Sequence, residues 1–264
     1  MPFKRLLCLV AVILLAACAK DDKPYVERPV DELYNEAMDR LKNDSFESAG
    51  KGFDEVERQH PYSVWATKAQ LMAAYAYYEA SKYDDAIIAI ERFVQLHPGS
   101  PDVGYAYYLK ALSYYEQITD VARDQKMTQL ALKSLQEVAD RFPNTAYARD
   151  AKLKLDLTRD HLAGKEMNIG RYYLKDDQYL AAINRFRTVV DKYQTTSHVP
   201  EALHRLVECY TALGLVDEAK KSASVLGHNY PGSPWYEDSF SFVQSGEPAK
   251  REEDEGWLGK IWPW

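Results

Sequence analysis

Apolar residues recur every three or four positions from Asp31 to about Val243, and almost no segment alternates apolar with polar residues as a strand does. This periodicity predicts an all-α protein. A proline followed two residues later by Ser or Thr interrupts the pattern repeatedly; the proline ends one helix, and the hydroxyl can cap the next. This signal occurs at Pro61, Pro98, Pro143 and Pro231, with a degenerate copy at Gln194.

Small residues lie at fixed distances from these positions. One set precedes them by 12 residues and consists of Ala49, Ala86, Ala131, Ala182 and Ala219. A second set follows three of them by 13 residues and consists of Ala74, Ala111 and Val207. Two helices of about 12 residues that cross at small side chains form the unit of an α-solenoid. The pattern resembles the tetratricopeptide repeat and predicts five units, at about 31–61, 65–98, 102–143, 165–195 and 199–231.

Two stretches depart from the regular spacing. The third unit has 20 residues between Ala111 and Ala131 where 12 is the norm, which predicts a loop of about eight extra residues near 118–125. Residues 146–174 are helix-permissive almost throughout, although the next unit starts only at about 165. We therefore expect one long helix that joins the N- and C-terminal halves of the solenoid.

The first helix of each tetratricopeptide unit lines the concave surface. Counting the small residue as position eight, positions two, five, nine and twelve face this groove. In the first three units these positions give Tyr34, Tyr75, Tyr78, Tyr105, Tyr108 and Tyr115, with Glu79 and Glu116 beside them. In the last two units they give Met167, Arg171, Leu174, His204 and Glu208. Aromatic residues with a polar tip suit peptide recognition, so the six tyrosines are peptide-groove candidates. The alternative is that several of them pack between neighbouring units.

The start of the chain carries an export signal. Lys4 and Arg5 precede an uncharged run over 6–17, which is too short to span a bilayer, and Cys18 follows two small residues. This arrangement resembles the bacterial lipobox, where the signal peptide is removed and the cysteine is acylated. We expect N-acyl and S-diacylglycerol chains on Cys18, and two lipid chains suffice for stable anchoring. By the same resemblance, Ala19 in place of Asp favours the outer membrane. The alternative is an ordinary signal peptide with a chance cysteine at its end.

The expected organisation has five parts: a signal peptide (1–17), a lipidated cysteine with a flexible tether (18–30), repeats 1–3 (31–145), the long helix with repeats 4 and 5 (146–243), and an acidic tail (244–264). The tail should be disordered because it is charged and contains Pro248. Near its end, Trp257, Leu258, Ile261 and Trp262 would share a face in one or two helical turns. We hypothesise that this tip docks at a membrane interface or on a partner; a flexible end is the alternative.

The sequence contains no motif specific to an enzyme: it has no phosphate-binding loop, nucleophile elbow or paired-cysteine metal signature. The net charge of −7, without a basic stripe, argues against nucleic acid as a partner. Cys8 leaves with the signal peptide and Cys18 is acylated, so Cys209 has no disulfide partner. His204 and Glu208 lie four apart on a helix, but we interpret them as a surface pair. We expect no catalytic residues, no metal site and no cofactor besides the lipid.

Several stretches of this chain are similar to the BamD family of outer-membrane lipoproteins, together with the order of lipobox, tether and five units. They are residues 74–78 (AYAYY), 89–93 (AIERF), 141–145 (RFPNT) and 182–186 (AINRF). The resemblance covers residues 6–240 and excludes the Trp-rich tail. It implies a non-enzymatic lipoprotein subunit of the outer-membrane β-barrel assembly complex, on the periplasmic face of that membrane.

The same resemblance implies partners for each half. The C-terminal repeats would dock on the periplasmic POTRA domains of BamA, and the N-terminal groove would receive the targeting signals of unfolded β-barrel clients, which typically end in an aromatic residue. Other assembly-machinery lipoproteins are further expected partners. Asn184 and Arg185 match the family position associated with communication to BamA, and Arg can form a forked bond to a carboxylate across an interface. The alternative for Arg185 is a surface residue lying over Tyr179.

A different function remains open from the sequence: a tetratricopeptide lipoprotein that acts as a scaffold for peptidoglycan or cell-envelope maintenance. A wall-cleaving enzyme with a helical arm would need a catalytic domain after the solenoid, and the roughly 20 residues after Val243 are too few to form one. A cell-wall scaffold would co-sediment with purified sacculi, whereas an assembly factor would not.

Overall fold

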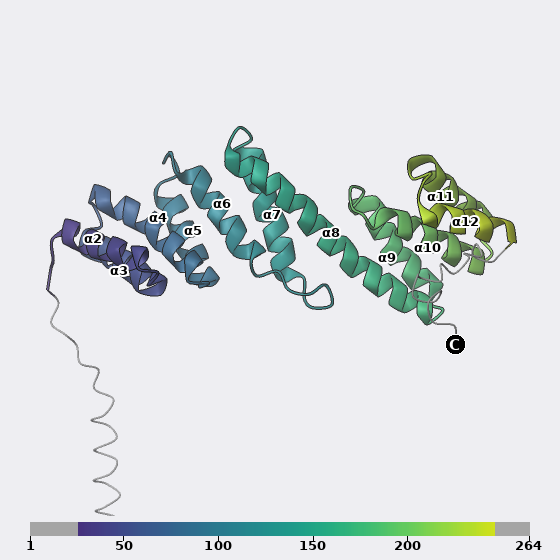
Figure 1. The fold of residues 1–264 in the computed structure, drawn as a ribbon, viewed down its shortest axis with the longest axis horizontal. Coiled ribbons are helices and arrows are strands. Elements are labelled where there is room, and N and C mark those ends of the chain that lie inside the picture. Colours follow the sequence, from purple (N-terminus) through teal and green to yellow (C-terminus); the bar gives the residue numbers. More distant parts are fainter. Residues whose placement is uncertain (1–25, 246–264) are drawn as a thin grey trace, which may run out of the picture.

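The computed structural model describes residues 26–245, and over this range it contains eleven α-helices and no strand. The helices stand side by side in a row along the long axis of the molecule, with α2 at one end and α12 at the other (Figure 1). The expected all-α solenoid is therefore confirmed. The expected signal peptide, Cys18 and the tail from residue 246 onward lie outside the described residues.

The helices form successive antiparallel pairs. The first three pairs are α2 (Val30–Lys42) with α3 (Phe46–Gln59), α4 (Val64–Glu79) with α5 (Tyr83–Leu96), and α6 (Val103–Tyr115) with α7 (Lys126–Arg141). The expected long helix is α8 (Ala146–Lys175), which packs against α7 and α9 (Tyr179–Lys192). The last pair is α10 (Val199–Ala212) with α11 (Val216–Asn229), and α12 (Pro234–Ser245) packs on both.

The small residues found by spacing lie where the helices cross. All eight of them, and Ala37, are between 0% and 1% exposed. Gly170 takes this position on α8: a Cβ there would lie 2.5 Å from Cε1 of Phe186. Large side chains such as Phe53 and Phe186 fill the space beside the crossings and are fully buried. Burial of these faces between neighbouring pairs is what holds a solenoid together.

The capping prediction is confirmed at three sites and wrong at two. The hydroxyls of Ser63 and Thr145 accept from the backbone N–H groups of Ala66 and Ala148, at 3.1 and 3.2 Å, and so cap α4 and α8. The Ser233 hydroxyl accepts from the backbone N–H of Trp235 at 3.3 Å and caps α12 in the same way. The other two hydroxyls do not cap the helix that follows, because each lies two residues before the N-cap position of that helix. They are Ser100 and Thr196.

The expected insertion in the third unit is the connection between α6 and α7, over residues 116–125. It packs across the middle of α8. Lys165 Nζ donates to the carbonyl oxygen of Ala122 at 2.8 Å, and Nδ1 of His161 lies 3.1 Å from Oε1 of Gln125. Gly164 leaves room for this approach, because a Cβ there would lie 3.3 Å from Val121. The insertion therefore braces the helix that joins the two halves.

The core is divided into clusters along the solenoid. One cluster joins α2–α5 around Phe53, whereas another joins α8–α11 around Phe186. Two smaller clusters lie between them. Within 26–245, no helix combines the length and the apolar character needed to cross a bilayer.

Candidate functional site

The first helices of successive pairs form one continuous wall in the N-terminal half. α2 contacts α4, α4 contacts α6, and α6 contacts the first part of α8. The second helices α3, α5 and α7 pack behind them. Side chains that these first helices do not use for pairing therefore share one surface, as the repeat counting predicts.

Tyrosines gather on this wall at α6 and α8. The ring of Tyr108 stacks on that of Tyr147 with centroids 5.2 Å apart, and the ring of Tyr105 lies 5.7 Å from Tyr147. The Tyr108 hydroxyl donates to Oδ2 of Asp150 at 2.6 Å. Asp150 also pairs with Lys154 at 2.9 Å. These contacts fix the rings and leave their edges on the surface, because all three tyrosines are partly exposed.

The adjoining tyrosines on α4 lie beside carboxylates. Burial raises the pKa of Tyr78 to about 12, helped by the charges of Glu116 and Glu79. Burial also raises the pKa of Tyr75, and Glu79 adds to this effect. Burial and the neighbouring Tyr75 raise the pKa of Tyr105. The phenols therefore stay neutral at physiological pH, as hydrogen-bond donors with apolar ring faces.

The structure brings together five of the six groove candidates and separates the sixth. Tyr75, Tyr78, Tyr105, Tyr108 and Tyr115 follow one another along α4 and α6, and with Tyr147 we call them the tyrosine face. Tyr34 lies apart on α2, where its ring packs against Phe53 at 5.4 Å and Trp65 at 4.8 Å. All six candidates are partly buried. Their role in binding stays a prediction.

Part of this surface was missed by the sequence reasoning. Asp150, Leu153 and Leu157 follow Pro143 by the same intervals at which groove positions two, five and nine follow the other prolines. The repeat count for the fourth unit starts near residue 165, so it does not cover the first half of α8. Leu153 and Leu157 are 68% and 61% exposed. They extend the tyrosine face with apolar side chains.

A cavity of about 360 Å³ opens between the end of α6 and α8. Its walls are Tyr115, Glu116, Ile118, Thr119, Leu157, Thr158 and His161. This volume lies near the lower end of the range for ligand pockets, so it suits one or two side chains of a polypeptide. The ammonium of Lys154 lies 5.7 Å from the ring centroid of Tyr115.

In the C-terminal half, two of the expected groove positions are buried, and α12 covers one of them, His204. Met167 is fully buried and His204 is 2% exposed, so the expectation that these two residues face a groove is wrong. The interpretation of His204 and Glu208 as a surface pair is also wrong. Nδ1 of His204 lies 2.9 Å from Oγ of Ser239 on α12, and Nε2 lies 3.3 Å from Glu208. The ring of Trp235 lies 5.3 Å from the imidazole.

Ion pairs tie α8 to α10 beneath this helix. Arg171 donates two bonds to Glu201, and Arg205 contacts both Glu201 and Glu208. Burial raises the pKa of Glu208, but the bonds from His204 and Arg205 outweigh it, so the net shift is downward. The pKa of Glu201 is also lowered, because Arg171 and Arg205 outweigh its burial. Among residues 26–245, no group of three or more His, Cys, Asp or Glu side chains is placed to hold a metal ion.

The partner-docking candidates lie on α9, beside the junction of the two halves. Asn184 and Arg185 line a shallow cavity of about 230 Å³ with Tyr173, Ala181 and Thr188. Nη1 of Arg185 lies 3.1 Å from Oε2 of Glu166 on α8, and Arg185 keeps 41% of its side chain exposed. The guanidinium is thus held in place by one carboxylate and remains accessible to another.

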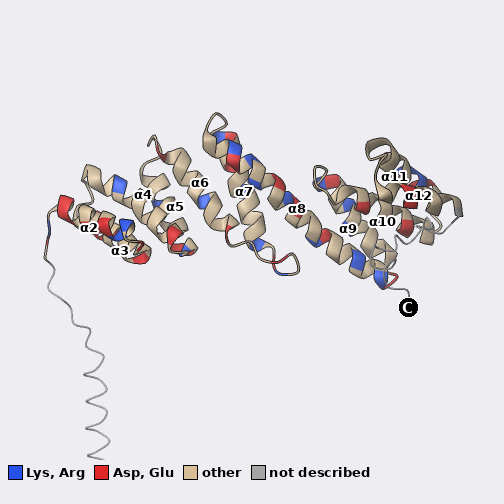
Figure 2. Cartoon of the chain, viewed as in Figure 1, with Lys and Arg blue, Asp and Glu red and all other residues tan. Residues whose placement is uncertain are grey.

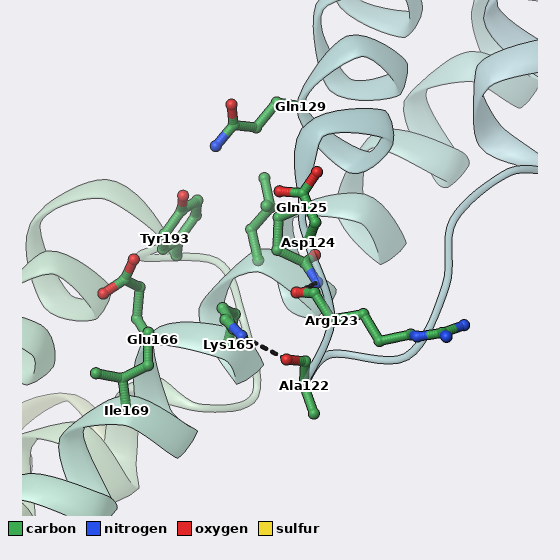
Figure 3. Close-up of a pocket in the computed structure, with 10 residues that line it drawn as sticks. Ala122, Arg123, Asp124, Gln125, Gln129, Lys165, Glu166, Ile169 and Tyr193 are labelled. Carbon is green, nitrogen blue, oxygen red and sulfur yellow. Dashed lines mark hydrogen bonds between the residues drawn. The ribbon is translucent and has the colours of Figure 1, made fainter.

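Glu166 itself lines a third cavity, of about 450 Å³, between the α6–α7 connection and α8. Figure 3 shows Glu166 beside Tyr193 on one side of this cavity, with Arg123, Asp124 and Gln125 on the other. Lys165 reaches across to Ala122. The carboxylate that holds Arg185 therefore lies across one cavity from the insertion.

Comparison with known proteins assigns the chain to a family. The family model YfiO, described as outer membrane lipoprotein, matches residues 26–239. The chain belongs to this family. A protein from Caulobacter vibrioides named outer membrane protein assembly factor BamD is 52% identical over 238 residues, which cover 89% of this chain and 78% of that protein. Its namesake from Rickettsia prowazekii is 48% identical and covers 90% of this chain and 95% of its own length.

The YfiO family assignment confirms the resemblance found in the sequence. Its members named above are assembly factors, which supports the expectation that this chain is not an enzyme. The family description also associates the chain with the outer membrane. Among solved structures, the TPR2AB domain of yeast Sti1 aligns with a TM-score of 0.41 and 12% identity, covering 81% of this chain and 83% of that one.

Proposed function

We propose that this chain is a non-enzymatic lipoprotein subunit of the machinery that assembles β-barrel proteins in the outer membrane. The observation that carries the proposal is the 52% identity to an outer membrane protein assembly factor over most of the chain. The solenoid supports it, because stacked helix pairs present extended surfaces to several partners at once. A lipid on Cys18 would hold this body at the periplasmic face of the membrane.

The C-terminal half docks the POTRA domains of BamA through the surface around Asn184 and Arg185. Support comes from the geometry of Arg185, which is oriented by Glu166 and still offers donors to a partner carboxylate. We expect Arg185→Glu to weaken binding to purified BamA POTRA domains about tenfold or more, since it replaces attraction by repulsion. Surface plasmon resonance measures the loss.

A matched control is Arg187→Glu on the same helix, where the side chain is exposed and makes no ion pair among the described residues. It should leave binding unchanged. The exchange Glu166→Arg with Arg185→Glu restores an internal pair but not the charge offered to the partner, so binding should stay weak. Full affinity in Arg185→Glu would remove Arg185 from the interface.

The N-terminal half receives unfolded β-barrel clients on the tyrosine face. Support comes from the partly exposed phenol rings and from the exposed Leu153 and Leu157 next to them. A photoreactive p-benzoylphenylalanine at position 153 or 157 should crosslink to a urea-unfolded β-barrel protein diluted onto the full-length lipoprotein in detergent. The same group at Tyr62, which is fully exposed outside this face, is the control. Equal crosslinking at all three positions would contradict the assignment.

A further inference from the structure

The cavity at the end of the tyrosine face is not required by the packing of the repeats. Leu157 forms one wall of it and is nevertheless 61% exposed, and Leu153 lies one turn away, also exposed. Tyr115 and Ile118 provide the opposite apolar walls. An apolar side chain that entered this cavity would cover surface that now faces water, and such burial is favourable.

The charge around this cavity is unbalanced. α4 and α6 carry few charged residues, whereas α8 is charged along its length (Figure 2). Within the described part of the chain, neither Glu79 nor Glu116 forms an ion pair, although both approach Tyr78. The ammonium of Lys154, which lies near Tyr115, is already paired with Asp150. Two carboxylates with a phenol ring between them form a site that attracts a cation.

We propose that this end of the tyrosine face selects an extended polypeptide segment in which an apolar or aromatic residue and a Lys or Arg lie two positions apart. The apolar side chain would enter the cavity, and the cation would pair with Glu116 and Glu79. Side chains two apart in an extended chain point to the same side, which matches a cavity with a carboxylate at its rim. This inference rests on the proposed function, and it adds the chemistry of the bound segment.

The test is a selection from a displayed random peptide library on the full-length protein in detergent. We expect enrichment of sequences with Lys or Arg two positions from an aromatic or aliphatic residue. The variant Glu79→Gln with Glu116→Gln keeps the side-chain size and removes both charges, and it should lose this preference. A matched control, Glu47→Gln with Glu137→Gln on the second helices α3 and α7, should retain it.

Affinities of one enriched peptide, measured by fluorescence anisotropy, give the size of the effect. We expect the double variant on the face to bind it about fivefold more weakly, and the loss to shrink at high salt because exposed charges are screened. Leu157→Ser should weaken binding separately, since it removes an apolar wall. Leu157 is exposed, so this change leaves the fold intact.

The outcomes separate this inference from the proposal on which it rests. Enriched peptides without basic residues, or equal affinity in Glu79→Gln with Glu116→Gln, would overturn the charge preference while peptide capture stands. Unchanged binding in Leu157→Ser would exclude the cavity as the apolar subsite. No enrichment over an empty support would overturn both this inference and client capture by the tyrosine face.

Discussion

The two halves of this solenoid use the same repeat positions in opposite ways. In the N-terminal half, positions on the inner wall carry phenol rings and leucines that remain partly open to solvent. In the C-terminal half, Met167 lies in the core, and α12 packs on α10 and covers His204. A repeat position therefore predicts where a side chain points. Whether a ligand reaches it depends on what the chain places over it afterwards.

The largest expected effect comes from the two separate core clusters. Phe53→Ala and Phe186→Ala each remove a fully buried ring, and each should lower the free energy of unfolding by about 3–5 kcal/mol. Because repeat proteins contact only their neighbours, each loss should fall mainly on its own half. Hydrogen exchange read by mass spectrometry checks this, with increased exchange in α2–α4 for Phe53→Ala and in α9–α11 for Phe186→Ala. Uniform loss of protection over 26–245 in either variant would show that the halves unfold as one unit.

A smaller loss of stability should distinguish a residue of the covering helix α12 from an exposed residue of α8. Trp235→Ala removes the ring that lies over His204 and Arg205 and should cost about 2 kcal/mol. Leu153→Ala on the open wall should change stability by less than about 0.5 kcal/mol, because its side chain is already in water. Urea titrations of the two variants provide the comparison. Equal costs would mean that Leu153 is covered by another part of the chain.

The smallest effect is a difference in pH dependence. The pKa values of Glu201 and Glu208 are lowered in the folded state. Their contribution to the free energy of unfolding is therefore complete above the ordinary pKa of 4.5 and is lost as the pH falls below that value. The pKa of Tyr78 is raised from 10.0 to about 12. Its contribution to the free energy of unfolding is therefore complete below about pH 10 and is lost as the pH rises through about 12. Acid should therefore loosen the contacts of Glu201 and Glu208 between α8 and α10, and alkali should loosen the packing around Tyr78.

Hydrogen exchange, recorded during thermal unfolding at acid and at alkaline pH, measures the pH dependence of each region. Tyr78→Phe is the control, because it removes the titrating hydroxyl and should reduce the alkaline loss near α4 and α6. An alkaline loss of the same size in Tyr78→Phe would assign the effect to other groups.

The spacing of small residues was enough to predict the helix pairs, because every crossing needs a residue without bulk at a fixed turn. It also predicted that Tyr105 and Tyr108 share a surface. It could not predict the roles of Tyr147 and Leu157. The first half of α8 packs on the third unit, and the repeat count covers only the second half, which belongs to the fourth unit. The cover over His204 was also hidden, because the contact between Ser239 and His204 joins positions 35 apart and follows no repeat spacing.

The uninterrupted course of α8 has a further consequence. Each residue of a helix adds about 1.5 Å of length and turns the chain by about 100°. One residue added between the tyrosine face and Arg185 would therefore swing the second half about a quarter of a turn around the first. The number of residues in α8 sets both the distance between the two halves and their rotation about the helix axis. Insertions that add nearly whole helical turns to α8 keep this rotation, whereas other insertions turn one half away from the binding partner of that half.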